Sequence, residues 1–538
     1  MASISAASAI TATIGAFEKK RMTILGIGGL LSDAACAILK DGELKAAVEE
    51  AKVTRNFRPG QMPEASIEEC LRLAGASRSD VDCVAVVRPF AQGPESAFHL
   101  ALRDQFPNAE VAVLEHHQAH AASAFFASPF EEATILTLDN AGDFRCGALW
   151  RATQNQIQVE KEWYYPDSIG RLYGAVTEFL GFRARADEHK VQWLSASGDD
   201  RFVALFREIL QPSARMDASF FAGGRPAAGG FGPKFIERLG HVDPPSIARG
   251  LQEAVQERVL AMAGEGENLC LAGGLFFNVL LVEYLERSGK WKNVFVQAVA
   301  GNAGTALGAV FHVWHQMQKQ TRRVCGASLL LGPSYNADEI KRVLENCKLR
   351  FRYVPSTDDL LTNAVRLLGE QKILAWMQGR MEFGPRALGN RSLLASPLDP
   401  YSTENLNIFI KHREPFRKFA ASVPAERANE YFEVGANARN LATVGRVRPA
   451  HRKTFEPAIL GHEHCRDLVR VHTVEEAENP LYHRLLHAAG SATGLPVLYN
   501  TSFNLFGDSL VSTPRDAVRS FYSSGIDALF VGNFVLEK

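Results

Sequence analysis

The chain has 538 residues and carries 59 basic against 60 acidic side chains, a formal net charge of −1. This balance excludes a broad electrostatic attraction to DNA, RNA or an anionic membrane, so no nucleic-acid partner is expected. The length exceeds what one hydrophobic core usually covers and predicts two domains, with three as the alternative.

Eight cysteines are scattered without a C-x-x-C pair, which indicates reduced thiols and a cytoplasmic protein. No apolar run reaches the roughly 18 residues of a membrane span, so no membrane partner is expected. Residues 1–22 are rich in Ala and Ser and lack the basic start of a secretory signal. We expect them to form a disordered extension.

The first predicted elements are three consecutive strands. Residues 23–29 are rich in β-formers, and residues 34–50 are two apolar runs joined by Asp41-Gly42, the signal of a tight hairpin. The same design recurs at 133–143, 144–152 and 156–165. The repeat predicts two related α/β lobes.

Helical spacing follows at 66–75 and 168–181, and the short apolar runs at 268–274 and 294–304 end in glycine-rich turns. Such turns let backbone N–H groups approach phosphates and are typical of nucleotide-binding α/β folds.

A basic stretch at 315–324 marks a domain boundary near 318–330. Beyond it, predicted helices at 357–370, 480–490 and 514–524 alternate with strands at 372–378, 495–503 and 528–537. The pattern predicts a second α/β domain.

His116 and His120 stand four apart in the helix-like stretch HHQAHAASAFF, at the spacing that lets one helix give two ligands to a metal. On spacing alone, a helix cap or a core pair is the better interpretation. Asp139 and Asp143, at the end of the repeated hairpin, could add oxygen ligands, but on spacing alone plain turn residues are the better interpretation.

The densest motif is GRMEFGPRALGNRS at 379–392. Its glycines 379, 384 and 389 recur every five residues, and Arg380, Arg386 and Arg391 lie among them. Guanidinium forks on a glycine-rich backbone suit phosphate or carboxylate, so an anion site is favoured over solvated arginines.

Two further polar stretches follow. IKHREPFRKF at 410–419 places four cations among aromatic residues, and NTSFN at 500–504 places amides and a hydroxyl after a buried-looking strand. Amides and a hydroxyl there could orient a carbamoyl group or an adenine edge. The alternatives are a basic helix face and an Asn-rich turn.

Together these stretches resemble the O-carbamoyltransferase family that includes nodulation-factor and antibiotic-tailoring enzymes. The similarity runs from about residue 23 over nearly the whole chain. It is most specific in GRMEFGPRALGNRSLLA, KHREPFR, LPVLYNTSFN, HHQAHAASAFF and AGGLFFN.

The resemblance implies an α/β protein of two domains. Residues 23–325 would form an actin-like, ribonuclease-H-like domain with a duplicated hairpin, and residues 326–538 a YrdC-like α/β domain. The second would make carbamoyl adenylate from carbamoyl phosphate and ATP, and the first would pass the carbamoyl group to a hydroxyl of a small-molecule acceptor, such as a sugar or secondary metabolite.

The resemblance also implies site residues. The anion and carbamoyl-phosphate site falls on Arg386, Lys411, Arg417, Arg470, Asn500 and Ser502, with Asn278 and Lys190 as further binding residues. Lys411, Arg417 and Asp139 would be catalytic. His116 and His120 would bind a divalent metal, with Fe(II) the expected ion.

Four positions depart from the family pattern. Asn302 stands in GNAG where the family has an aspartate ligand, and Ser32-Asp33 where it has a His-Asp pair. Phe57 and Val282 replace a lysine and an asparagine. Because an amide lacks the carboxylate's charge, Asn302 would be a weak metal ligand.

Two functional hypotheses follow, with a third as an outlier. The first is an O-carbamoyltransferase. The second is a half-active or non-catalytic paralogue that partners a complete carbamoyltransferase, so either a homodimer or such a pairing is expected. The hairpins alone would also allow a sugar kinase or a chaperone-type ATPase.

Overall fold

The computed structural model describes residues 22–56, 58–90, 93–226, 229–320, 328–461, 465, 467–505 and 507–538. Residues 1–21, Phe57 and the predicted boundary at 325/326 lie outside the described residues. Met22, expected to be the last residue of a disordered extension, is instead buried, and its backbone N–H donates to Asp41 Oδ1 at 3.0 Å.

The first sheet contains the predicted hairpin. Its strands are β1 (Thr23–Gly28), β2 (Ala35–Lys40), β3 (Glu43–Glu49), β4 (Cys83–Val87) and β5 (Glu110–Leu114), in the order β3-β2-β1-β4-β5. Asp41 and Gly42 have φ of 55° and 81°, as the mirror-image turn of a tight hairpin requires. β4 and β5 join parallel to β1.

The second sheet repeats this topology. Its strands are β6 (Glu132–Gly142), β7 (Arg145–Thr153), β8 (Gln156–Tyr164), β9 (Asn268–Ala272) and β10 (Asn293–Val296), in the order β10-β9-β6-β7-β8. Three antiparallel strands are again followed by two parallel ones. The predicted duplication is confirmed, and it is the actin-like, ribonuclease-H-like arrangement.

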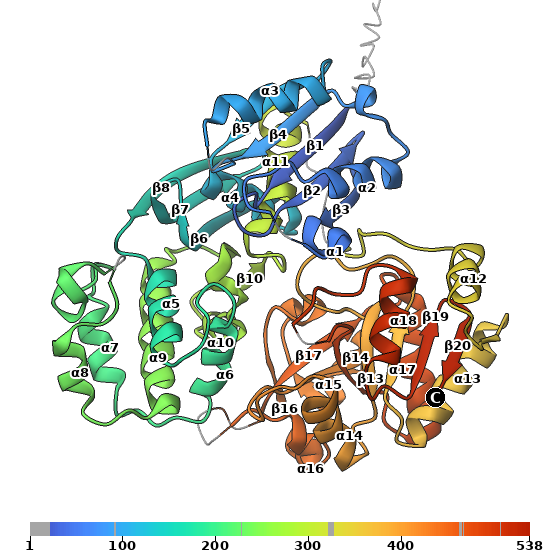
Figure 1. Ribbon diagram of the computed structural model, residues 1–538. Coiled ribbons are helices and arrows are strands. Elements are labelled where there is room, and N and C mark those ends of the chain that lie inside the picture. Colours follow the sequence, from blue (N-terminus) through green and yellow to red (C-terminus); the bar gives the residue numbers. More distant parts are fainter. Residues whose placement is uncertain are drawn as a thin grey trace, which may run out of the picture.

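Two helices are packed between these sheets, α4 (His116–Ala127) and α11 (Thr305–His312), as Figure 1 shows in the upper part of the molecule. Nearly every side chain of both is buried. They touch at Gly308, where a Cβ would come within 1.8 Å of the Ala119 carbonyl oxygen. The absence of a side chain at Gly308 therefore allows α4 to sit close enough to present its histidines beside β6.

The remaining helices of this half cover the sheets or form an insertion. α1 (Glu50–Thr54), α2 (Glu64–Ala74) and α3 (Glu95–Gln105) flank the first sheet, and α10 (Val279–Arg287) follows β9. The insertion between β8 and β9 is a group of helices, green in Figure 1: α5 (Ile169–Phe179), α6 (Glu188–Ser195), α7 (Val203–Ile209), α8 (Pro233–Leu239) and α9 (Pro244–Met262).

The second half is built on a ten-stranded mixed sheet, in the order β11-β20-β19-β12-β13-β18-β14-β17-β16-β15. The strands are β11 (Arg352–Tyr353), β12 (Leu374–Met377), β13 (Arg391–Ala395), β14 (Ala420–Pro424), β15 (Phe432–Glu433), β16 (Gly445–Val447), β17 (Leu468–Val474), β18 (Leu498–Ser502), β19 (Ala528–Val531) and β20 (Phe534–Glu537). The segment 528–537, predicted as one strand, is a hairpin because Gly532 and Asn533 turn the chain.

Helices line this sheet: α12 (Ala337–Asn346), α13 (Thr357–Gly369), α14 (Pro400–Asn405), α15 (Ala428–Tyr431), α16 (Arg452–Phe455), α17 (Pro480–Thr493) and α18 (Pro514–Tyr522). Three of them confirm the predicted helices at 357–370, 480–490 and 514–524. None of the helices in the described part of the chain has the length and apolarity that a bilayer crossing requires.

The Gly308 contact makes a stability prediction. In Gly308→Ala the new methyl group would meet backbone, which cannot rotate away, so we expect the free energy of unfolding to fall by about 1–3 kcal/mol in urea titrations. Gly369→Ala is the matched control, because Gly369 also lies in a helix, as the last residue of α13, but its Cβ would meet nothing within 4 Å. Equal stability of the two variants would contradict the close packing of α4 on α11.

Candidate functional site

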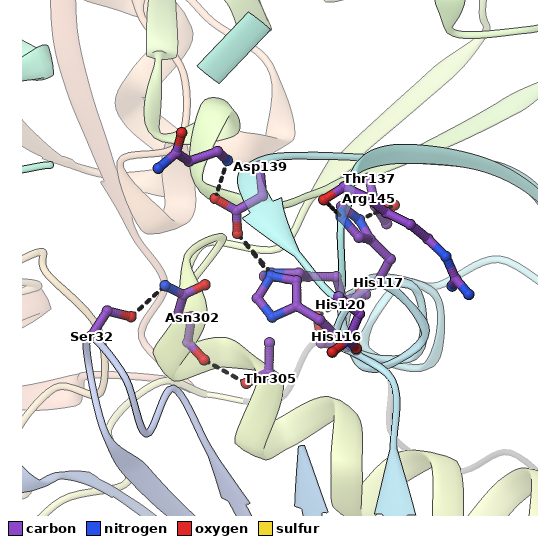
Figure 2. Close-up of polar contacts among 12 residues, drawn as sticks. Ser32, His116, His117, His120, Thr137, Asp139, Arg145, Asn302 and Thr305 are labelled. Atoms are coloured by element: carbon purple, nitrogen blue, oxygen red, sulfur yellow. Dashed lines mark hydrogen bonds and ion pairs between the residues drawn. The ribbon is translucent and has the colours of Figure 1, made fainter. Parts of the chain in front are cut away.

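The two predicted metal histidines meet a carboxylate. His116 and His120 lie one turn apart on α4, and Asp139 lies near the end of β6 (Figure 2). Asp139 Oδ2 is 3.0 Å from His116 Nε2 and 3.3 Å from His120 Nε2, and the two Nε2 atoms are 3.1 Å apart. The structure thus brings together three residues that the sequence separated into two motifs.

The spacing of these three atoms fits one shared ion. Two ligands that each lie about 2.1 Å from a metal, at angles near 90–110°, are themselves roughly 3.0–3.4 Å apart. Two imidazoles and one carboxylate on one side of an ion, with open positions opposite, is the facial arrangement typical of non-haem Fe(II).

The electrostatics also favour a cation. Burial alone would raise the pKa of Asp139, but the hydrogen bonds of His116 and His120 outweigh it and hold that pKa well below its usual range. Burial lowers the pKa of His120, which keeps its imidazole neutral and able to act as a ligand. Burial, with the carboxylates of Glu49 and Asp139 nearby, raises the pKa of Asp33 to about 6. A divalent ion would relieve this crowding of carboxylates.

Two of the residues that differ from the family pattern are hydrogen-bonded to each other. The Asn302 amide donates to Ser32 Oγ, across the sequence distance between the first hairpin and the start of α11 (Figure 2). Asn302 Oδ1 is buried and has no hydrogen-bond partner among the described residues, and the same holds for His120 Nδ1. The Asn302 oxygen is therefore available to a ligand or a water molecule.

The neighbours of the cluster have structural roles. His117 is buried, and its Nδ1 lies 3.0 Å from Thr137 Oγ1. Asp143, considered as a possible oxygen ligand, instead accepts from the backbone N–H of His116 at 3.1 Å. It thereby caps the N-terminus of α4 and fixes the first histidine in place.

A second group of predicted residues gathers in the other half of the molecule, where five cations are buried or half-buried together: Arg386, Lys411, Arg413, Arg417 and Arg470. Among the described residues, their ion pairs with carboxylates are limited to one, between Arg417 and Glu414 at 3.5 Å. We call this group the cation cluster.

The cations of this cluster lower one another's pKa values. Burial and the neighbouring Arg417 lower the pKa of Arg386 to about 10 and that of Arg413 to about 9. Burial, with Arg386, Arg413 and Arg417 close by, holds the pKa of Arg470 well below its usual range. Like charges held together without counter-charges are unfavourable unless an anion completes the site.

Lys411 is held by the turn after β18. Its Nζ donates to the backbone oxygens of Ser502 and Asn504 at 2.8 and 2.7 Å, and to Asn504 Oδ1 at 2.6 Å. Ser502 Oγ donates to the same Oδ1. Asn500 donates to the Ala387 carbonyl, while its own Oδ1 is buried without a partner in the described chain. That oxygen can accept an N–H from a bound amide.

Helix α6, part of the insertion in the first half of the chain, packs against the cation cluster. Lys190 pairs with Glu414 at 2.8 Å, and Trp193 lies under the Arg470 guanidinium at 5.5 Å from its ring centre. Beside Lys190, His189 was not predicted; burial, with Arg417 and Arg386 nearby, lowers its pKa to about 3. Sequence adjacency to Lys190 is the signal that could have found it.

Asn278, predicted as a binding residue, lies at the start of α10. It is the N-cap of α10, where Oδ1 accepts from the Leu281 N–H at 3.0 Å. Its Nδ2 donates to Gln252 Oε1 at 2.7 Å. Both ends of the amide thus bond within the protein, and the binding role of Asn278 stays a prediction.

The three arginines of the arginine-glycine motif have different surroundings. Arg391 is fully buried and donates to the carbonyls of Gln378 and Pro333, at 2.6 and 3.1 Å. Arg380 donates to the carbonyls of Leu331 and Lys45. Several N–H donors of Arg391 and Arg380 thus end on backbone carbonyls, and of the three arginines Arg386 is the one that lies in the cation cluster. The anion site in this motif stays a prediction.

The loop is organised by a carboxylate that the sequence did not single out. Glu382 is completely buried, and its Oε1 accepts from the backbone N–H groups of Leu388, Asn390 and Arg391 at 2.8 to 3.0 Å. Gly389 faces Tyr482 so closely that a Cβ would lie 2.2 Å from the ring. These contacts fix the backbone that carries Arg386.

A cavity lies away from both groups. It has a volume of about 810 Å³, and it lies between the two halves beside β10 and β16. None of the predicted site residues lines it. The cation cluster and the histidine site are therefore shaped by charge and hydrogen bonding and not by this cavity.

Both halves of the chain are similar to one family of known proteins. A family model described as the carbamoyltransferase C-terminus matches residues 365–538, and one described as the carbamoyltransferase N-terminus matches residues 95–222 and 247–311. Together these matches cover most of both halves.

Three relatives illustrate the similarity. An uncharacterised protein of Synechocystis sp. is 33% identical and aligns over 96% of each chain. The nodulation protein NolNO of Sinorhizobium fredii is 30% identical, over 94% of this chain and 79% of its own. A 3'-hydroxymethylcephem-O-carbamoyltransferase of Amycolatopsis lactamdurans is 30% identical over 50% of this chain and 48% of its own. The chain belongs to the carbamoyltransferase family, as its motifs predicted.

Proposed function

We propose that the protein is an ATP-dependent O-carbamoyltransferase that carbamoylates a hydroxyl of a small-molecule acceptor. The cation cluster is the observation that carries this proposal, because it assembles five cations around a single ion pair with a carboxylate. Carbamoyl phosphate and ATP are both polyanions that would supply the missing charge. The antibiotic-tailoring relative, an O-carbamoyltransferase by name, supports the reaction class.

The first step would take place at the cation cluster. Water cleaves carbamoyl phosphate to carbamate and phosphate, and a carbamate oxygen then attacks the α-phosphorus of ATP, giving carbamoyl adenylate and pyrophosphate. Arg386, Arg417 and Arg470 would hold the phosphates, and Lys411 would neutralise charge that develops during the attack. The free Oδ1 of Asn500 would accept an N–H of the carbamoyl group.

The second step would take place at His116, His120 and Asp139. These residues would hold a divalent ion, for which Fe(II) fits the donor set; when bound, it supplies Lewis-acid polarisation of the carbamoyl oxygen. The hydrogen bond that the His116 backbone N–H donates to Asp143 holds the start of α4 beside the end of β6. The acceptor hydroxyl oxygen would form the new C–O bond, its proton would pass to solvent, and the bond between the carbamoyl carbon and the AMP oxygen would break.

The second candidate is a half-active paralogue that supplies carbamoyl adenylate to a complete carbamoyltransferase. The Ser32–Asn302 hydrogen bond favours it, because a neutral pair lies where the family pattern has an imidazole and a carboxylate. The kinase and chaperone-type ATPase hypotheses are set aside, since the chain belongs to the carbamoyltransferase family. The cytoplasmic location and the homodimer or paralogue pairing stay predictions, as do the YrdC-like identity of the second domain and the boundary at 325/326.

The two-site proposal predicts separable defects. Lys411→Ala and Arg417→Ala should each lower carbamoyl-phosphate-dependent pyrophosphate release from ATP by about 10²-fold or more, because each removes a charge from the adenylating site. His116→Ala should keep this release, since it lies in the other site.

Arg207→Ala is the control for loss of a cation, because Arg207 pairs with Glu257 on the exposed face of the insertion. Circular dichroism would confirm that each variant is folded. Pyrophosphate release that survives in both cluster variants would refute an adenylating role for the cation cluster.

The histidine site predicts the metal content. His120→Ala should lose one equivalent of bound divalent metal, measured by plasma mass spectrometry, because the ion would keep only two of its three protein ligands. His117→Gln should retain it, since His117 bonds to Thr137 and is not a member of the cluster. An equal loss in both variants would show that fold damage, and not ligand loss, removes the metal.

A further inference from the structure

A second histidine pair lies on the helix α17 in the carbamoyltransferase C-terminal half. His483 and His487 are four residues apart and occupy one face of the helix, with ring centres 4.6 Å from each other. Glu426, on the short turn that follows β14, faces both. Its Oε1 lies 3.1 Å from His483 Nε2 and 2.6 Å from His487 Nε2.

This arrangement repeats the geometry of the first site. There too, two histidines one turn apart on a helix direct both Nε2 atoms at one oxygen of a carboxylate from a neighbouring strand end, at 3.0 and 3.3 Å. In the described part of the chain these two groups are the ones whose histidine and carboxylate atoms converge closely enough to share an ion. No step proposed above uses the second group.

The second group differs from the first in exposure. The side chain of His483 is 9% exposed, whereas those of His487 and Glu426 are 42% and 53% exposed. A metal could therefore enter from solvent, and water could fill the positions that the protein leaves open. Two imidazoles and one carboxylate, with water in the fourth position, is an established ligand set for Zn²⁺.

We propose that Glu426, His483 and His487 form a binding site for a divalent transition-metal ion, with Zn²⁺ as the best-fitting ion. The ion ties the start of α17 to the end of β14. That tie bears on the adenylating half, because the cap residue of α17, Asn479, donates to the Leu388 carbonyl and to Asn390 Oδ1. Ser422 of β14 accepts from Asn500. The ion would thus brace the two elements that support the loop of Arg386.

The test is a Co²⁺ titration of the full chain after chelator treatment, followed by visible absorption, with Zn²⁺ as competitor. His116→Ala/His120→Ala removes the first site, so this double variant should bind one equivalent at micromolar protein. Adding His487→Ala or Glu426→Gln should abolish that equivalent. Adding His241→Ala, which changes an exposed histidine outside both groups, should leave it in place.

A second readout guards against misfolding. Zn²⁺ should raise the Tm of the double variant and leave that of the His487→Ala derivative unchanged, because an ion that binds only the folded state stabilises it. His487 is partly exposed, so its loss should not unfold the chain. Absence of Co²⁺ binding by the double variant, or binding that persists without His487 or with Glu426→Gln, would overturn the proposal.

Discussion

The structure depends on an excess of buried positive charge where the helical insertion meets the ten-stranded sheet. The guanidinium groups there are largely removed from water, and their like charges repel one another. A fold retains such a cost where function needs it, since the same charges stabilise a bound polyanion much more strongly than exposed ones would. Nearby structure serves this cluster: Trp193 under Arg470, Glu414 between Lys190 and Arg417, and the buried carboxylate of Glu382 beneath the loop of Arg386.

The two sites are connected by a short series of contacts. Arg386 donates to the Phe277 carbonyl at 3.4 Å, and the Phe277 ring lies so close to Gly301 that a Cβ there would be 2.6 Å away. Gly301 precedes Asn302, which bonds to Ser32 on the first hairpin. On the other side, Lys52 donates to the Glu382 carbonyl. A shift of the loop that carries Arg386 would therefore be transmitted to the hairpins around the histidine site.

The sequence predicted features that follow from local periodicity. The duplicated hairpins follow from alternating apolar residues and the Asp41-Gly42 turn, and the helical spacing of His116 and His120 placed both on one face. The sequence did not reveal which side chains would bond to segments far away along the chain. Arg380 and Arg391 look like Arg386 in the motif, yet their donors end on carbonyls of other segments, which only the folded chain brings near. His483 and His487 also had helical spacing, but the carboxylate that they face belongs to Glu426, which lies in the turn after β14, 57 residues before His483.

The most direct test of the account is the stability of Arg470→Met with and without anions. Methionine is shorter than arginine but also unbranched, and it has no charge, so relief of repulsion should leave the free variant at least as stable as the wild type in urea titrations. Carbamoyl phosphate with ATP should then raise the Tm of the wild type strongly and that of the variant little, because an anion that binds the folded state stabilises it. A variant that is less stable without ligand but gains as much from the anions as the wild type would contradict the central claim, since Arg470 would then be structural.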